Sequence, residues 1–163
     1  MESGGSLTVV TKKAEETKEL GVMLGKLLVS GDLLFLSGDL GSGKTLFVRG
    51  ITKGLNSTEL ATSPTFALIH RYEGDLPLYH LDLYRLRSRE ELRALALEEI
   101  LEEEAAVVLE WGDLAKENLP SDFLEVFFQR GETDNSRRLI FSPHGERYQE
   151  LIRRLMNHAD LGD

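Results

Sequence analysis

The chain has 163 residues, of which 41% are hydrophobic and 4 are proline, a composition typical of a compact globular domain rather than a disordered chain. Its formal net charge of −9 disfavours direct, non-specific binding to nucleic acid, which requires a basic surface. Cysteine is absent, which excludes disulfides and thiolate metal sites.

The length favours one domain over residues 1–163, and we expect residues 1–6 to form a disordered N-terminus. The stretch MESGGSLTVVTKKAEE at the start has no apolar core of signal-peptide length. No later segment approaches the roughly 20 apolar residues of a membrane span. These features predict a soluble, cytoplasmic protein with no membrane partner.

The first third of the chain predicts alternating strands and helices. Residues 7–10 (LTVV) predict a short strand, and residues 14–30 have leucines at helical spacing, with Gly31 as the expected C-terminal stop. Residues 32–37 (DLLFLS) form an apolar run suited to a strand that is buried on both faces of a parallel sheet. A helix is predicted for residues 44–55, after a glycine-rich loop.

The middle of the chain predicts a hairpin and a helix after a polar connection. Residues 66–72 and 77–84 read as two strands joined by a turn, and the second strand alternates, so we expect it to be covered on one face only. Residues 88–103 predict a single helix that begins with a capping box. Seven glutamates and one arginine lie within residues 90–104, which indicates either a solvated helix face or a docking surface for a basic partner.

The last third predicts a mixed sheet. Residues 105–111 (AAVVLEW) form a continuous apolar strand that ends in a carboxylate, residues 122–130 and 137–142 read as an antiparallel pair, and residues 146–158 predict an amphipathic helix. Arginines gather at 137, 138, 147, 153 and 154. Together these elements predict an α/β fold with a mixed sheet.

The strongest motif is GDLGSGKT, which satisfies the pattern G-x-x-x-x-G-K-[ST] through Gly38, Gly43, Lys44 and Thr45. It lies between a predicted buried strand and a predicted helix, which is the context that this loop requires. Glycines let backbone N–H groups turn toward phosphate oxygens, and the helix N-terminus adds its positive dipole end. Lys44 would supply charge to the β- and γ-phosphates, and the Thr45 hydroxyl could ligate Mg²⁺. The motif predicts a nucleoside triphosphate site.

Phosphoryl chemistry at such a loop also needs a carboxylate near the metal. Glu110 fits by pattern, because five apolar residues deliver it to the carboxyl edge of the sheet. Asp82 is the second candidate, and an ion pair with nearby arginines is its alternative role. His80 is interpreted as a packed or hydrogen-bonded histidine, and Trp111 as either a core residue or a residue that lines the site.

A possible switch segment, SPTF at residues 63–66, lies between the loop and these acids. GTPases and related ATPases carry a threonine there that senses the γ-phosphate. Thr65 is therefore either a switch residue or an ordinary turn threonine.

The segments GDLGSGKT, SPTF, LYHLDLYRL and LEWGD, in this order and with these intervals, resemble the TsaE (formerly YjeE) family of bacterial P-loop ATPases. The resemblance runs from about residue 11 to residue 145 and is weakest after residue 123. It implies a P-loop NTPase-like fold with helices on both faces of the sheet. Members of this family are required for threonylcarbamoyladenosine modification of tRNA at adenosine 37.

The resemblance also implies roles for individual residues, with ATP and Mg²⁺ as cofactors. Thr45 and Glu110 would ligate Mg²⁺, Lys44 would hold the phosphates, and Asp82 would orient water or act as base in hydrolysis. Trp111 would support the site or a partner contact. The implied nucleotide-binding residues are Asp39, Leu40, Gly41, Ser42, Gly43, Lys44, Thr45, Thr65 and Trp111.

The implied partners are TsaD- and TsaB-like proteins, with tRNA contacted indirectly through their complex. Two departures from the family pattern, Ser42 in place of alanine and Gly112-Asp113 in place of Pro-Glu, remove no group that the mechanism needs. A small-molecule kinase and a nucleotide-dependent binding module without relevant hydrolysis are the alternatives. A regulatory GTPase is disfavoured, because N-K-x-D and D-x-x-G strings do not occur.

Overall fold

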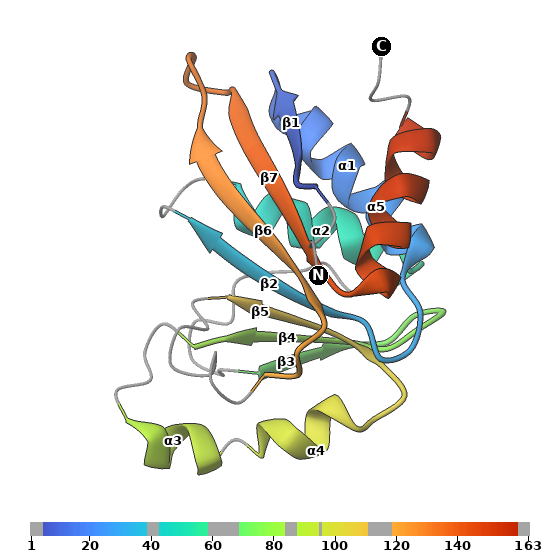
Figure 1. Ribbon diagram of the computed structural model, residues 1–163, viewed down its shortest axis with the longest axis vertical. Coiled ribbons are helices and arrows are strands. Elements are labelled where there is room, and N and C mark those ends of the chain that lie inside the picture. Colours follow the sequence, from blue (N-terminus) through green and yellow to red (C-terminus); the bar gives the residue numbers. More distant parts are fainter. Residues whose placement is uncertain are drawn as a thin grey trace.

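The computed structural model has a seven-stranded mixed β-sheet with helices on both of its faces (Figure 1). It describes residues 5–38, 43–58, 69–83, 88–94, 96–110 and 119–159. This architecture confirms the fold class that the sequence predicts.

The sheet is parallel at its centre and antiparallel toward its edges. Its strands are β1 (Leu7–Thr11), β2 (Leu33–Gly38), β3 (Ile69–Tyr72), β4 (Leu78–Asp82), β5 (Ala106–Glu110), β6 (Phe123–Arg130) and β7 (Arg137–His144). They are arranged in the order β1-β7-β6-β2-β5-β4-β3, and β6, β2, β5 and β4 run parallel. β7 is antiparallel to β6 and β1, and β3 is antiparallel to β4, so both predicted hairpins are confirmed.

The helices form two unequal layers, as Figure 1 shows. The larger layer packs on the face with the larger core, and the smaller layer lies on the opposite face. The larger layer consists of α1 (Ala14–Leu27), α2 (Lys44–Gly54) and α5 (Glu146–Ala159), and the smaller one of α3 (Arg89–Ala94) and α4 (Leu97–Leu101).

Successive side chains of β5 pack alternately into the cores on the two faces of the sheet. Ala106 and Val108 belong to the larger core, on the side of α1, α2 and α5. Val107 and Leu109 belong to the smaller core, which also contains Leu97 of α4. Because each successive side chain points to the opposite face, a strand in this position must be apolar throughout, as the sequence predicts.

Four glycines let the backbones of α1 and α2 touch: Gly21, Gly25, Gly50 and Gly54. A Cβ atom added at Gly50 of α2 would lie 2.0 Å from the carbonyl oxygen of Lys18 in α1. A Cβ atom added at Gly21 of α1 would lie 2.3 Å from the carbonyl oxygen of Phe47. Any larger residue would separate the helices, so this contact sets the position of α2 and of its N-terminus at the end of β2.

Three details differ from the sequence prediction. The helix predicted for residues 88–103 is divided into α3 and α4, with Ala96 in the left-handed region at φ 54°, and this turn allows Ile100 to join the smaller core. α1 ends at Leu27 rather than near Gly31, which instead occupies a turn at φ 92° on the way to β2. β4 is covered on both faces, because His80 and Leu81 are each fully buried.

Other predictions hold or lie outside the described residues. The N–H of Glu91 donates to the Ser88 hydroxyl at 3.2 Å, which is half of the predicted capping box. Residues 1–4 of the predicted disordered N-terminus and most of the polar connection, residues 59–65, lie outside the described residues. Within the described part of the chain, each helix is too short or too polar to cross a membrane.

Candidate nucleotide-binding site

The glycine-rich motif begins where β2 ends, at the carboxyl edge of the parallel strands. Gly38 has a φ of 127°, and a Cβ atom there would lie 2.2 Å from the carbonyl oxygen of Phe128 on the neighbouring strand β6. Only glycine satisfies both constraints, so the first glycine of the motif is required by the sheet itself. Asp39, Leu40, Gly41 and Ser42 lie outside the described residues.

The last glycine of the motif opens the helix. Gly43 is the N-cap of α2 with a φ of 104°, and the first turn that follows carries no acidic residue. A Cβ atom at Gly43 would make ordinary contacts, at 3.6 Å to Thr17 and 3.8 Å to Arg137. The N-terminus of α2 therefore presents its positive dipole end to the edge of the sheet, in the arrangement that favours a bound phosphate.

Lys44 links the strand to the helix. Its side chain is buried, and its Nζ donates a hydrogen bond of 2.8 Å to the carbonyl oxygen of Gly38. The ammonium group thus lies at the base of the loop, between the end of β2 and the start of α2. Thr45, the next residue, is half-buried in the first turn of α2. The roles that the motif predicts for Lys44 and Thr45 stay predictions.

Asp82 and Glu110 are brought together by the sheet. They are paired residues at the ends of the adjacent parallel strands β4 and β5. Leu78 and Val108 precede them on the same face and belong to the larger core, which is the core that contacts α2. Both carboxylates therefore lie on the face of the sheet that carries Lys44 and Thr45. Both faces of β4 are buried, but Asp82 itself is half-buried whereas Glu110 is buried.

Glu110 is 5% exposed and forms a hydrogen bond with His80, which is fully buried. The bond joins Nε2 of the imidazole to Oε2 of the carboxylate, and because a carboxylate only accepts, Nε2 is the donor. The interpretation of His80 as a hydrogen-bonded histidine is confirmed. The sequence did not identify its partner, which lies 30 residues further along the chain.

The remaining predicted site residues, Thr65 and Trp111, lie outside the described residues. Among the residues that the structure does describe, no group of three or more His, Asp or Glu side chains could enclose a metal ion.

Arg137 is a further candidate that sequence reasoning named without a role. Its guanidinium donates to the carbonyl oxygens of Asp134 at 2.7 Å and Ser136 at 2.8 Å, and its side chain lies beside Gly43. Arg130 lies directly opposite it in the β6–β7 register, whereas three other arginines of the C-terminal region are paired with acids. Arg153 and Arg154 pair with Glu150, and Arg147 pairs with Asp32.

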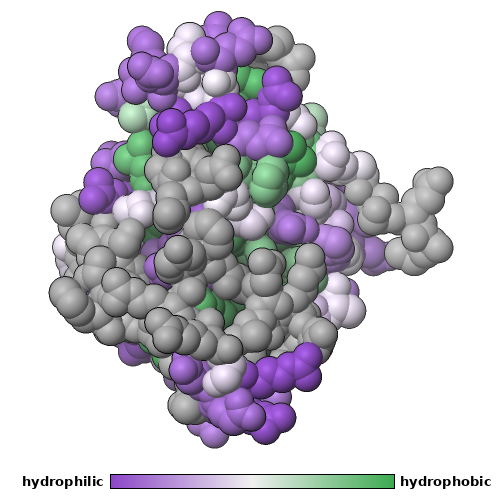
Figure 2. Space-filling model, turned by 90° about the vertical axis from the view of Figure 1, so that its left-hand side faces the viewer, coloured by the Kyte–Doolittle hydropathy of each residue, from purple (hydrophilic) through white to green (hydrophobic). Residues whose placement is uncertain are grey.

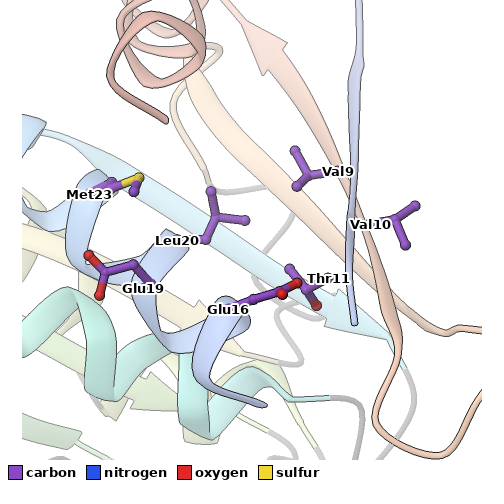
Figure 3. Close-up of a pocket in the computed structure, with 7 residues that line it drawn as sticks. All are labelled: Val9, Val10, Thr11, Glu16, Glu19, Leu20 and Met23. Carbon is purple, nitrogen blue, oxygen red and sulfur yellow. The ribbon is translucent and has the colours of Figure 1, made fainter. Parts of the chain in front are cut away.

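The side of the molecule toward which β2, β4 and β5 point carries polar side chains at its two ends. Figure 2 shows hydrophilic side chains at the top and bottom of this side, with apolar ones only in small patches. A separate groove of about 220 Å³ lies between β1 and α1, where Val9 and Leu20 face each other and Glu16 and Glu19 lie along the helix (Figure 3). The described residues that line it are apolar, polar or acidic and include no cation that could hold a phosphate.

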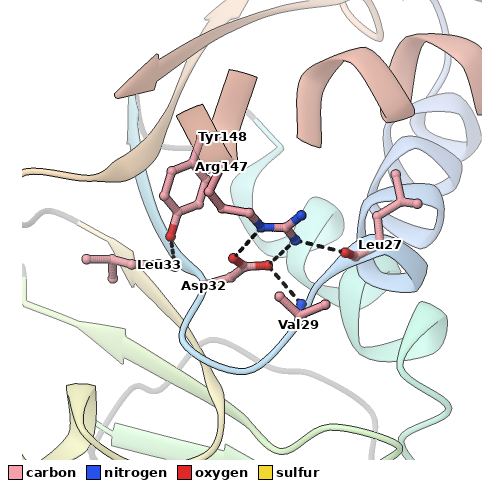
Figure 4. Close-up of polar contacts among 6 residues, drawn as sticks. All are labelled: Leu27, Val29, Asp32, Leu33, Arg147 and Tyr148. Atoms are coloured by element: carbon pink, nitrogen blue, oxygen red, sulfur yellow. Dashed lines mark hydrogen bonds and ion pairs between the residues drawn. The ribbon is translucent and has the colours of Figure 1, made fainter. Parts of the chain in front are cut away.

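A second polar cluster lies at the opposite edge of the sheet (Figure 4). Asp32, at 2% exposure, accepts from Nε of Arg147 at 2.9 Å and from a second guanidinium nitrogen at 2.7 Å. It also accepts from the backbone N–H of Val29 at 2.8 Å. The hydrogen bond with Asp32 raises the pKa of Arg147 above its usual range, and burial raises the pKa of the neighbouring Tyr148 to about 12.

With this geometry in place, comparison with known proteins assigns the chain to a family. The family model described as "Threonylcarbamoyl adenosine biosynthesis protein TsaE" matches residues 11–139. The chain belongs to the TsaE family. The match includes the glycine-rich loop, Asp82 and Glu110, and it ends in β7, before α5.

Individual TsaE relatives are similar in sequence to this chain along most of their length. The Bacillus subtilis protein named tRNA threonylcarbamoyladenosine biosynthesis protein TsaE is 37% identical over 154 residues, which cover 94% of this chain and 96% of that protein. The Nostoc protein of the same name is 42% identical over 145 residues, covering 85% and 86%. A crystal structure of Bacillus subtilis YdiB superposes with a TM-score of 0.82 at 34% identity, covering 95% of this chain and 97% of that one.

Proposed function

We propose that this chain is a Mg²⁺-dependent ATPase that acts with TsaD- and TsaB-like proteins in the threonylcarbamoyladenosine modification of tRNA. Its relatives in the TsaE family are named as biosynthesis proteins for this modified nucleoside. The observation that carries the ATPase proposal is the position of Lys44. Its ammonium group lies between the end of β2 and the positive end of α2, over the same sheet face as two paired carboxylates.

The described residues fit a nucleoside triphosphate. The first turn of α2, after Gly43, carries no acid that would repel a phosphate, and Lys44 would contact the β- and γ-phosphates as a point charge. The loop residues Asp39, Leu40, Gly41, Ser42 and Gly43 would surround the phosphates with their N–H groups. Thr65 would respond to the γ-phosphate, and Trp111 would line the site.

Thr45 and Glu110 would hold Mg²⁺. A hydroxyl from the start of the P-loop helix and a carboxylate from an adjacent strand are the oxygen donors that this ion takes in P-loop proteins. When bound, Mg²⁺ neutralises charge that develops on the phosphate oxygens. Asp82, directly across from Glu110, would orient the attacking water or accept its proton.

The overall charge supports a partner that contacts the RNA. At −9, the chain has no net attraction for a polyanion, and three arginines of its C-terminal region are paired with acids. The glutamates of α4 and of the residues that follow it, Glu98, Glu99, Glu102, Glu103 and Glu104, are exposed. We therefore propose that tRNA is contacted by the TsaD–TsaB complex rather than by this chain.

The test is ATP hydrolysis by the purified chain, alone and with a purified TsaD–TsaB pair. We expect low turnover alone, a clear rise with the pair, and loss of both in Lys44→Ala. Lys53→Ala, which removes an exposed lysine from the other end of α2, is the matched control and should behave as wild type. No response to the pair, together with transfer of phosphate to a small acceptor, would favour the small-molecule kinase instead.

A further inference from the structure

The buried residues His80 and Glu110 lie on adjacent strands, and their relative positions suggest a role other than packing. His80 lies opposite Val108 in the β4–β5 register, whereas Glu110 lies opposite Asp82. The imidazole is therefore the diagonal neighbour of Glu110, two residues back from the end of β4. Diagonal neighbours on one face of a sheet are within reach of long side chains, and here the bond is made.

This bond determines where the carboxylate points. Two carboxylates directly opposite each other on adjacent strands repel. The Nε2–H of His80 draws Oε2 of Glu110 back along β4, away from the Asp82 position at the strand end. His80 engages Oε2, so Oε1 is the carboxylate oxygen that this bond leaves free for a cation.

The environment of His80 favours this single orientation. Its side chain has no exposure, and its Nδ1 has no hydrogen-bond partner within the part of the chain that the structure describes. The ring therefore has one polar contact there, and that contact is the carboxylate of Glu110. A buried imidazole that makes one directed bond holds the carboxylate much as outer-sphere groups hold metal-binding side chains.

We propose that His80 is a positioning residue for Glu110, holding Oε2 so that Oε1 faces the Mg²⁺ of the nucleotide. This inference rests on the proposed role of Glu110 as a metal ligand. The inference adds to that site a residue, His80, that lies outside the glycine-rich loop. His80 itself contacts neither nucleotide nor metal in this scheme.

The first test uses the protein without nucleotide. Long-range ¹H–¹⁵N spectra distinguish the two neutral tautomers of an imidazole, and we expect His80 to carry its proton on Nε2. Glu110→Ala should move the His80 signals, and Glu125→Ala, which removes a carboxylate at His144, should not. An Nδ1–H tautomer, or signals that do not respond to Glu110→Ala, would overturn the proposal before any activity is measured.

The second test compares two amides at position 80. In His80→Gln the side-chain amide nitrogen reaches the place of Nε2, whereas in His80→Asn it reaches only the place of Nδ1. We expect His80→Asn to raise the Mg²⁺ concentration for half-maximal hydrolysis by about 10-fold or more, the usual loss when an outer-sphere partner of a metal ligand is removed. In His80→Gln, the Mg²⁺ concentration for half-maximal hydrolysis should return most of the way to the wild-type value. Nucleotide affinity measured without Mg²⁺ should be the same in both variants.

His70→Leu is the matched control. His70 lies directly opposite His80 on β3, but its ring bonds to the Tyr72 hydroxyl at 3.0 Å rather than to Glu110. The His70→Leu variant should therefore have the same Mg²⁺ dependence of hydrolysis as wild type. Thermal unfolding of all three variants shows whether stability alone explains a change, because a structural role would not separate Mg²⁺ dependence from nucleotide affinity.

The outcomes separate this inference from the proposed function. If wild type hydrolyses ATP and Glu110→Ala loses its Mg²⁺ response, but His80→Asn matches wild type, the positioning role is wrong and the ATPase stands. If wild type shows no Mg²⁺-dependent nucleotide binding, both are wrong. If His80→Asn and His70→Leu shift the Mg²⁺ dependence equally, the effect is general to this hairpin and the positioning role is also wrong.

Discussion

The two edges of the sheet each carry a buried acid, and the two acids are satisfied in different ways. Asp32, just before β2, receives two hydrogen bonds from one guanidinium and a third from a backbone N–H. Glu110, at the end of β5, receives a hydrogen bond from the single imidazole nitrogen of His80. A buried acid that is bonded at both oxygens to a full positive charge cannot lose that partner without leaving an uncompensated charge in the fold. One that is held through a single oxygen remains available to a ligand.

The strongest test of this comparison is to remove the cation that is paired with Asp32. Arg147→Met leaves Asp32 buried without its partner, and we expect it to lower the free energy of unfolding by about 3 kcal/mol. Urea unfolding measures this loss. Hydrolysis per folded molecule should match wild type, because the pair lies at the edge away from Lys44.

The control is on the same helix. Arg153→Met removes an exposed arginine that pairs with Glu150 at the surface, and such pairs contribute about 0–1 kcal/mol. An equal loss of stability in Arg153→Met and Arg147→Met would show that the Asp32 pair has no special role.

The opposite change is made at the carboxyl edge of the parallel strands, where Glu110 lies. Glu110→Gln keeps an oxygen that can accept from His80 but removes the negative charge. We expect Mg²⁺-dependent hydrolysis to fall by about 100-fold, since a metal contributes several kcal/mol to such a reaction, while the unfolding midpoint changes little. A Mg²⁺ titration of the ATPase rate checks this. Normal Mg²⁺-dependent turnover would transfer the metal role to Asp82.

A smaller effect is expected from Tyr148→Phe. The Tyr148 hydroxyl accepts a hydrogen bond of 2.8 Å from the N–H of Leu33, at the start of β2. Phenylalanine fills the same space but leaves that buried N–H unpaired, which costs about 1–2 kcal/mol. Urea unfolding at neutral pH measures the loss. Unchanged stability would mean that water reaches this N–H.

A further effect concerns pH at the same edge. Burial raises the pKa of Tyr148 from the usual 10.0 to about 12, so the fold favours the neutral phenol. The resulting stabilisation is complete below pH 10 and is lost as the pH rises from 10 to about 12. The free energy of unfolding should therefore fall less over this range in Tyr148→Phe than in wild type. An equal fall in the free energy of unfolding with pH in both proteins would contradict the raised pKa of Tyr148.

The sequence predicted most of the elements that place the nucleotide site. Gly38, Gly43, Lys44 and Thr45 lie close together in the chain, and the strand and helix that flank them follow from local periodicity. Glu110 was placed correctly at a strand end by the apolar run before it. The division of the 88–103 helix at Ala96 could not be predicted in this way, because the helical pattern continues through that residue.

Local pattern determined the loop, the strands and the acids of this protein, and tertiary structure decided which of them meet. His80 contacts Glu110 because β4 and β5 are neighbours in the sheet, an order that periodicity along the chain does not contain. Arg147 reaches Asp32 across 115 residues because α5 packs against the start of β2. The physical reason is the same in both cases. Periodicity reports which face of an element is buried, whereas the partner of a buried polar group depends on how the elements are arranged in space.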